Sequence, residues 1–369
     1  MPRVQSKRKR YTFKSSYKRK SKNLRGVKKF IRLLAISISG LFFFCIAFYL
    51  YTLTQNIKKP FANASDGVDF SEKSYDSTRP FNILAIELKN IEDRASDIVS
   101  LYIYHLDTID SKSFLLKVPV NVNVEYPRSL EEPIPIYKFY SLGNAGNESS
   151  GVELTGGFIR NYLAINADGY IIYDKNTVAA LKDLGINFNK ENIPDSIKYS
   201  DFLKISKLFE ISRKMILSDL TSVEIIRLVG DIKNISNTSY EYVELEDSNM
   251  NDPKEFDSYW QELSNYTEIH SERLSVTILN GTSVDGVASW GARTVKNVKG
   301  IVLEVGNYSK GSDSNIIYTS LEKSALLDYV VNLHNVKEIR RPEDFEYDPF
   351  LAKRSDILLL LGKQTLSDF

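Results

Sequence analysis

A predominantly apolar stretch without a charged residue runs from Leu33 to Leu53. As a helix that rises about 1.5 Å per residue, this stretch matches a hydrocarbon core of roughly 30 Å. We therefore predict a single transmembrane helix over residues 33–54. A cleaved signal peptide is the alternative, since residues 62–64 (Ala-Asn-Ala) resemble a cleavage site, but the apolar core of a signal peptide is shorter.

Beyond a polar, aperiodic linker at residues 55–80, continuous apolar runs alternate with amphipathic segments. The runs are rich in β-branched and aromatic residues, which is typical of strands buried on both faces. Strands are predicted at Phe81–Ile86, Ile98–Tyr104, Phe114–Val118 and Tyr170–Tyr173. Together with the helices between them, they predict a mixed α/β domain over residues 81–235.

Helices in this domain are predicted from apolar residues that recur at helical spacing and from capping residues. They are expected after Asn176, as an N-cap, up to Gly185, from Ser200 up to Leu220, and at Val223–Val229. Thr221 and Glu224 form a capping box in front of the last helix, because each side chain can bond the backbone N–H of the other residue.

Residues 236–272 differ in composition from the segments on either side. They contain ten acidic residues and one basic residue, Lys254, with little periodicity. We predict an acidic linker here, in which Trp260 packs on a neighbouring segment rather than binding a sugar.

The last part of the chain, residues 273–369, returns to an ordered pattern. Strands are predicted at Leu274–Leu279, Ile301–Val305, Asn315–Tyr318 and Ile357–Leu361, with helices from Val287 and at Leu321–Leu333. This order predicts a smaller, separate α/β domain. Asn280-Gly281 is interpreted as a turn in which glycine adopts a positive φ.

Charge is distributed unevenly along the chain. The first 32 residues hold 14 basic residues and no acidic one, which leaves 34 basic against 47 acidic residues in the remainder, a net charge of −13. Because cations favour the cytoplasmic side of a membrane span, residues 1–32 are expected in the cytoplasm and the body outside it. Attraction to anionic lipid explains the basic tail without specific nucleic-acid binding, which is the alternative interpretation.

Several kinds of chemistry lack support in the sequence. A single cysteine, Cys45, excludes a disulfide framework and a cysteine-rich metal site. The three histidines, His105, His270 and His334, lie in no short metal-binding spacing. No P-loop, G-x-S-x-G or H-E-x-x-H motif occurs, so nucleotide hydrolases, serine hydrolases and zincins are not indicated.

Several segments in the carboxy-terminal third resemble those of a known family. VTILNGTSVDGVA from Val276, IVLEVGN from Ile301 and LLLLGK from Leu358 are similar in content and order to the carboxy-terminal domain of LytR-type envelope proteins. The middle region resembles the LytR-CpsA-Psr catalytic domain. FNILAI from Phe81 is similar to its opening strand, Arg94-Ala-Ser-Asp97 to its Arg-Ser-Asp motif, and the segment from Phe158 to Asn187 to a later part of the domain.

The resemblance implies a membrane-anchored envelope protein that transfers a glycopolymer from a polyprenyl-pyrophosphate carrier to peptidoglycan. Such chemistry needs guanidinium donors on the pyrophosphate and a carboxylate-held Mg²⁺ to neutralise charge on the leaving group. By resemblance, Asp97 would hold Mg²⁺, and Arg94 and Arg213 would bind the pyrophosphate as the catalytic residues.

The chain departs from the family's pattern at several positions. An acid expected after the first strand is Lys89, and an Arg-Asp pair of the third strand is replaced by Val120 and Asn121. The family's R-x-x-R-Q helix pattern falls on Glu210, Arg213 and Lys214, which keeps one arginine. Two functions therefore stay open: a phosphotransferase, or a non-catalytic envelope binding or scaffolding protein that has lost the transferase site.

Overall fold

The computed structural model describes residues 74–126, 132–145, 150–198, 200, 204–250 and 252–367. All of them belong to one compact unit that spans residues 58–369. The predicted cytoplasmic tail, the predicted membrane span and most of the predicted linker 55–80 lie outside the described residues. Within the described ranges, no helix has the length and apolar character that a membrane crossing needs.

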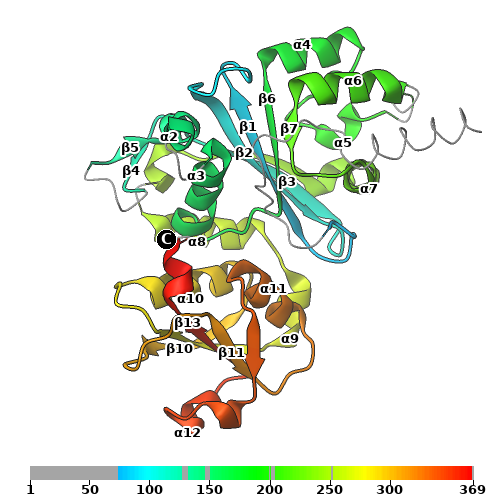
Figure 1. The fold of residues 1–369 in the computed structure, drawn as a ribbon. Helices are drawn as coiled ribbons and strands as arrows, with labels where there is room; N and C mark the ends of the chain where they lie inside the picture. The colour runs from blue at the N-terminus through cyan, green and yellow to red at the C-terminus, as the bar shows by residue number, and fades with distance from the viewer. Residues whose placement is uncertain are drawn as a thin grey trace, which may run out of the picture. The chain divides into compact units, whose positions relative to one another are not determined.

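A six-stranded mixed sheet forms the centre of the first domain, in the order β7-β6-β1-β2-β3-β8 (Figure 1). Its strands are β1 (Phe81–Leu88), β2 (Ile98–Asp107), β3 (Lys112–Val118), β6 (Gly169–Asp174), β7 (Leu217–Ser218) and β8 (Tyr240–Glu244). β1 runs antiparallel to β2 and parallel to β6. The four strands predicted from apolar runs are confirmed. They are β1, β2, β3 and β6, the inner strands of this sheet.

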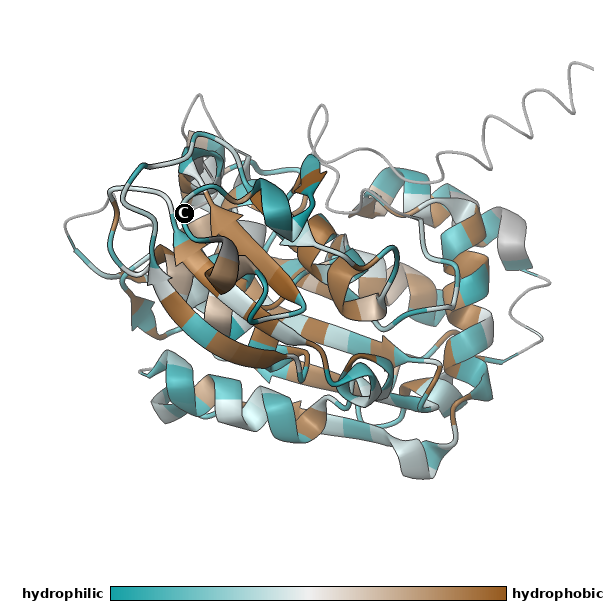
Figure 2. Ribbon diagram, turned by 90° about the horizontal axis from the view of Figure 1, so that it is seen from below, coloured by the Kyte–Doolittle hydropathy of each residue, from teal (hydrophilic) through white to brown (hydrophobic). Residues whose placement is uncertain are grey.

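Helices cover both faces of this sheet, which explains why the inner strands are apolar at most positions. One core contains side chains of α2 (Phe139–Ala145), α3 (Gly151–Gly157) and α8 (Pro253–Leu263). The core on the other face contains Tyr75 and side chains of α7 (Ser222–Asn234), with α5 (Ile193–Ser196) packed at its margin. Figure 2 shows hydrophilic and hydrophobic bands along the helices, with some strands mostly hydrophobic and others banded in the same way.

Several predicted helix boundaries are wrong, including the start of α11 (Ala325–Leu333), which is Ala325 and not Leu321. Asp174, not Asn176, is the N-cap of α4 (Lys175–Asp183), because its carboxylate accepts the N–H of Thr177. The helix predicted from Ser200 is α6 (Ile205–Met215), which ends before β7 although the apolar spacing continues. The capping box before α7 is confirmed, and that helix extends to Asn234.

The segment predicted as an acidic linker, residues 236–272, is instead an ordered part of the structure. It contains β8, which pairs in parallel with β3, as well as α8 and α9 (Thr267–Glu272). α8 turns Phe256 and Trp260 into the first core, where Trp260 is 1% exposed and packs against Phe114. The linker prediction is wrong because these few buried aromatic residues anchor an otherwise acidic segment to the core of the first domain. The packing predicted for Trp260 is confirmed.

A second mixed sheet, in the order β10-β9-β13-β11-β12, forms the carboxy-terminal domain. Its elements are β9 (Ser275–Asn280), α10 (Val287–Asn297), β10 (Ile301–Asn307), β11 (Ile316–Thr319), α11 (Ala325–Leu333), β12 (Glu338–Arg340), α12 (Pro349–Ala352) and β13 (Ile357–Leu361). The remaining strands, β4 (Asn123–Val124) and β5 (Ile134–Pro135), form a two-stranded ribbon. The predicted α/β class of both domains agrees with the structure.

Gly281 serves a different purpose from the one predicted. It does not have a positive φ, unlike Gly286 and Gly311 in the same domain. A side chain at Gly281 would approach the carbonyl oxygen of Leu361 and the Cβ of Ser312 to 3.0 Å each. Glycine is therefore required by close packing between β9, β13 and the following loop, not by backbone conformation.

The carboxy-terminal domain is joined to the first domain through α10. α3 continues into a π-helical turn, Phe158–Tyr162, whose terminal carbonyl groups need partners, as at any helix end. Trp290 donates to the carbonyl of Arg160 (3.1 Å), Arg293 to that of Tyr162 (3.0 Å), and Asn297 to those of Leu163 and Ala164 (3.4 and 3.3 Å). Side chains of one domain thus cap a helix of the other.

A buried ion pair strengthens this contact. Nε of Arg293 lies 2.6 Å from Oδ2 of Asp257 on α8, and its Nη2 lies 2.9 Å from Oδ1. Asn297 donates a further hydrogen bond to the same carboxylate (2.9 Å). The two domains therefore have separate sheets but share an interface with bidentate, charge-assisted geometry.

Candidate functional site

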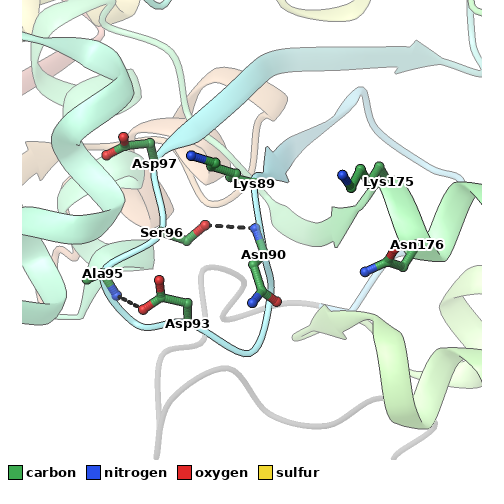
Figure 3. Close-up of a pocket in the computed structure, with 8 residues that line it drawn as sticks. All are labelled: Lys89, Asn90, Asp93, Ala95, Ser96, Asp97, Lys175 and Asn176. Atoms are coloured by element: carbon green, nitrogen blue, oxygen red, sulfur yellow. Dashed lines mark hydrogen bonds between the residues drawn. The ribbon is translucent and has the colours of Figure 1, made fainter.

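A pocket of about 460 Å³ lies where β1 ends and the loop to β2 faces the amino end of α4 (Figure 3). Its lining is polar except for one alanine: Lys89, Asn90, Asp93, Ala95, Ser96, Asp97, Lys175 and Asn176. Lys175 and Asn176 come from the first turn of α4, and the others come from the loop. The pocket is thus formed by two walls that belong to neighbouring parallel strands, β1 and β6.

The loop wall is fixed by its own hydrogen bonds. The hydroxyl of Ser96 accepts the N–H of Asn90 (2.9 Å), and the carboxylate of Asp93 accepts the N–H of Ala95 (2.9 Å). The backbone N–H of Lys89 also donates to the carbonyl of Asp97 (3.0 Å). These bonds close the loop between its two ends, so the lining side chains are presented from a defined backbone.

Asp174 links the loop wall to the helix wall of the pocket. Its carboxylate caps α4 through the N–H of Thr177 (2.9 Å) and accepts the N–H of Ile91 from the loop (3.5 Å). Burial acts to raise the pKa of Asp174, but hydrogen bonds from Thr177, Ile91 and Asn176 outweigh it and lower that pKa. The carboxylate is thus held ionised as a structural link.

Asp97, the predicted metal ligand, lies in the pocket but is already paired. Nζ of Lys138 lies 2.8 Å from its Oδ1, and the side chain of Asp97 is 36% exposed. The hydrogen bond to Asp97 raises the pKa of Lys138, which keeps the ammonium group charged. The pair stabilises the fold little at this exposure, but it balances the negative charge of Asp97.

The pocket does not fit the Mg²⁺ site that the resemblance implies. The ammonium group on Asp97 would repel a divalent cation, and Lys89 occupies the place where an acid is expected. No group of three His, Cys, Asp or Glu side chains is placed to hold a metal ion anywhere in the described ranges. Mg²⁺ prefers oxygen ligands that include one or two carboxylates. Of the two carboxylates that line the pocket, Asp97 is paired with Lys138 and Asp93 accepts the N–H of Ala95.

Two lysines give the pocket a different character. Lys89 comes from the loop wall, where its side chain extends toward Asp97, and Lys175 comes from α4 (Figure 3). Within the described part of the chain, neither side chain forms an ion pair. Because Asp97 is balanced by Lys138, these two ammonium groups face one remaining carboxylate in the pocket, that of Asp93. The amide of Asn176 donates to Asp174 (3.3 Å), and that of Asn90 accepts the N–H of Glu92 (3.1 Å).

The two predicted arginines do not line this pocket. Arg94 belongs to its loop, where its carbonyl accepts a hydrogen bond from Asn144 (3.0 Å). Arg213 is exposed in the last turn of α6, a helix that touches α4 through the hydroxyl of Thr177 and the carbonyl of Met215 (2.7 Å). No hydrogen bond or ion pair joins Arg94, Asp97 and Arg213 to one another in the described structure.

The substituted third-strand positions lie beyond β3. Val120 packs against the first core, and its carbonyl accepts the N–H of Tyr137 (2.9 Å). Asn121 is exposed. Sequence reasoning identified Lys89 only as a departure and missed Lys138 and Lys175. Lys175 could have been noticed beside the predicted N-cap, whereas no local signal connects Lys138 with Asp97.

Comparisons with known proteins give structural likenesses alone. No family model matches the chain, and no curated protein matches it. Similar solved structures include Bacillus subtilis TagV (14% identity, TM-score 0.37, covering 50% of this chain and 97% of that one). They also include TagT bound to LI-WTA (13% identity, TM-score 0.33, covering 50% and 87%).

A further similar structure is described as the LytR-CPS2A-psr family protein YwtF (TagT) with bound octaprenyl pyrophosphate lipid (12% identity, TM-score 0.34, covering 55% and 99%). This is the family that the middle region resembles in sequence. Likenesses of this size do not transfer an activity or a residue's role to this chain.

Proposed function

We propose that the chain is an extracytoplasmic cell-envelope protein of the LytR-CpsA-Psr type, anchored by residues 33–54, that binds a polyprenyl-linked glycan through its phosphate groups without transferring the glycan. The observation that carries this proposal is the pocket lined by Lys89 and Lys175, neither of which forms an ion pair with another described residue. Phosphate oxygens accept hydrogen bonds from ammonium groups, and such charge-assisted bonds are the stronger class.

The balance of charges in the pocket favours binding over catalysis. Transfer would require stabilisation of the charge that develops on the leaving phosphate. Asp97 is engaged by Lys138, and Arg94 and Arg213 do not line the pocket. Two lysines can hold an anion in its ground state, but they do not reproduce a guanidinium clamp with its fixed fork.

Binding can be tested with the full chain in detergent and octaprenyl pyrophosphate as the probe, the lipid named for a similar structure. Isothermal titration should give an affinity that falls by about tenfold, or 1.4 kcal/mol, in Lys89→Gln and in Lys175→Gln. Lys310→Gln is the matched control, because Lys310 is exposed in the carboxy-terminal domain. Equal affinities in all three variants would exclude the pocket as the phosphate site.

Catalysis is tested separately by the release of polyprenyl phosphate from a lipid-linked glycan in the presence of Mg²⁺. We expect no release above that of Asp97→Ala. Release by the unaltered chain that is lost in Asp97→Ala would overturn the non-catalytic proposal and support the phosphotransferase instead.

A further inference from the structure

Helix α7 carries an apolar outer face that no described segment covers. Val223 is 49% exposed and Ile226 is 47% exposed, at positions one helical turn apart. Gly230 continues this face, and a side chain added there would meet no atom within 4 Å. The opposite face of α7, with Leu228 and Ile232, is buried in the core beneath the first sheet.

The charges of α7 are divided between its two sides. Both acidic residues of α7 bind Tyr75, near the start of the described chain. Glu224 accepts the N–H of Tyr75 (2.9 Å), and Asp231 accepts its hydroxyl (2.7 Å). Arg227 is exposed beside Ile226. The outer face therefore combines aliphatic side chains with a cation and no exposed carboxylate.

The length of chain between α7 and the predicted membrane anchor limits how far apart the two can lie. Tyr75 lies against α7, where Arg227 also donates to its carbonyl (3.1 Å). The predicted span ends at residue 54, so about 20 residues connect it to this contact, and they reach at most about 70 Å. The outer face of α7 is thus within reach of the bilayer.

We propose that the outer face of α7 docks on the surface of an anionic membrane, with Val223 and Ile226 at the acyl boundary and Arg227 among the headgroups. Amphipathic helices bind at this boundary by burying apolar side chains, and each nearby cation adds attraction to anionic lipid. The proposal rests on the membrane anchor of the proposed function, and it gives the soluble body a fixed orientation on the bilayer.

The test uses the full chain in proteoliposomes of phosphatidylglycerol and phosphatidylcholine, with Cys45→Ala to remove the single native cysteine. An environment-sensitive fluorophore is attached at Ile226→Cys. Ile339→Cys is the matched control, because Ile339 is an aliphatic residue of β12 with 52% exposure. We expect quenching by nitroxide-labelled lipid to be several-fold stronger at position 226 than at position 339. Addition of Arg227→Gln should weaken it in anionic vesicles.

Equal quenching at the two positions would overturn the proposal. A blue-shifted but unquenched label at position 226 would show that another part of the chain covers the face, and a blue shift that disappears on dilution of the protein would show a second copy there. Both outcomes also overturn it. A separate experiment tests the anchor itself: vesicles with the unlabelled chain are extracted with alkaline carbonate. A chain with a transmembrane helix stays in the membrane, so release of the chain would show that the anchor, and not the docking of α7, has failed.

Discussion

Replacement of Arg293 with methionine is expected to weaken the interface between the two domains more than any exposed charge change. The guanidinium makes two bonds to Asp257 and one to each of two carbonyls, those of Tyr162 (3.0 Å) and Pro253 (3.3 Å). Methionine keeps the unbranched apolar stem but offers no donor. The substitution therefore removes four hydrogen bonds and one charge at a single position.

The magnitude follows from the burial of the pair. The side chains of Arg293 and Asp257 are 21% and 11% exposed, so the carboxylate would keep one donor, Asn297, and little solvent. Removal of one partner of a buried pair costs about 3–5 kcal/mol. The double variant Asp257→Leu/Arg293→Met leaves no buried charge and should cost less than the sum of the two single variants.

Urea unfolding of the full chain in detergent can be followed by tryptophan fluorescence. The two tryptophans of the chain, Trp260 on α8 and Trp290 on α10, are buried in the cores of the two domains. Their combined signal therefore reports both sides of the interface. A loss of unfolding free energy in Arg293→Met should shift the transition to lower urea concentration.

Arg340→Met provides the matched control. Arg340 pairs with Glu338 at 2.7 Å, but the two side chains are 39% and 49% exposed, and such pairs contribute about 0–1 kcal/mol. If Arg293→Met destabilised the chain no more than Arg340→Met, the buried pair would not hold the domains together, and the reasoning from burial would be refuted.

Three further outcomes are expected. Burial lowers the pKa of His105 and His334 from 6.5 to about 3, so below pH 6.5 the unfolded chain binds protons that the folded chain does not. The unfolding free energy, full above pH 6.5, should fall by about 2 kcal/mol per histidine by pH 5, as measured by urea titration at each pH. Gly157→Ala should lower the free energy of unfolding by about 1–3 kcal/mol, because its methyl group would collide with the hydroxyl of buried Tyr126. Addition of Tyr126→Phe to this variant should restore part of the thermal midpoint that it lost. Thr221→Ala should cost about 1 kcal/mol by loss of the α7 cap, with faster amide exchange in its first turn.

Elements whose burial is continuous were predictable from the sequence. β13 is apolar along its whole length, and β1, β2 and β3 are apolar at most positions, because they lie inside sheets covered on both faces. The capping box before α7 was equally clear, since both its residues act within one turn. The interpretation failed at residues 236–272, where β8 and α8 are held by a few side chains in a mostly acidic segment.

The candidate site shows the same division. Asp97 was predicted by its motif, and it does line the pocket. Its partner Lys138 lies 41 residues further along the chain, and Lys175 reaches the pocket from a different strand and helix. Neither contact leaves a local pattern, so the change from a metal site to a lysine-lined pocket was visible only in three dimensions.

The sequence by itself determined which segments bury apolar surface, which sign of charge each part of the chain carries and where a membrane anchor is expected, since hydropathy and charge are properties of consecutive residues. The tertiary structure decided which charged groups are neutralised. Lys138 neutralises Asp97 from 41 positions along the chain, and Arg293 neutralises Asp257 from 36 positions. An ionic interaction depends on distance in space and on local exposure to water, and folding sets both.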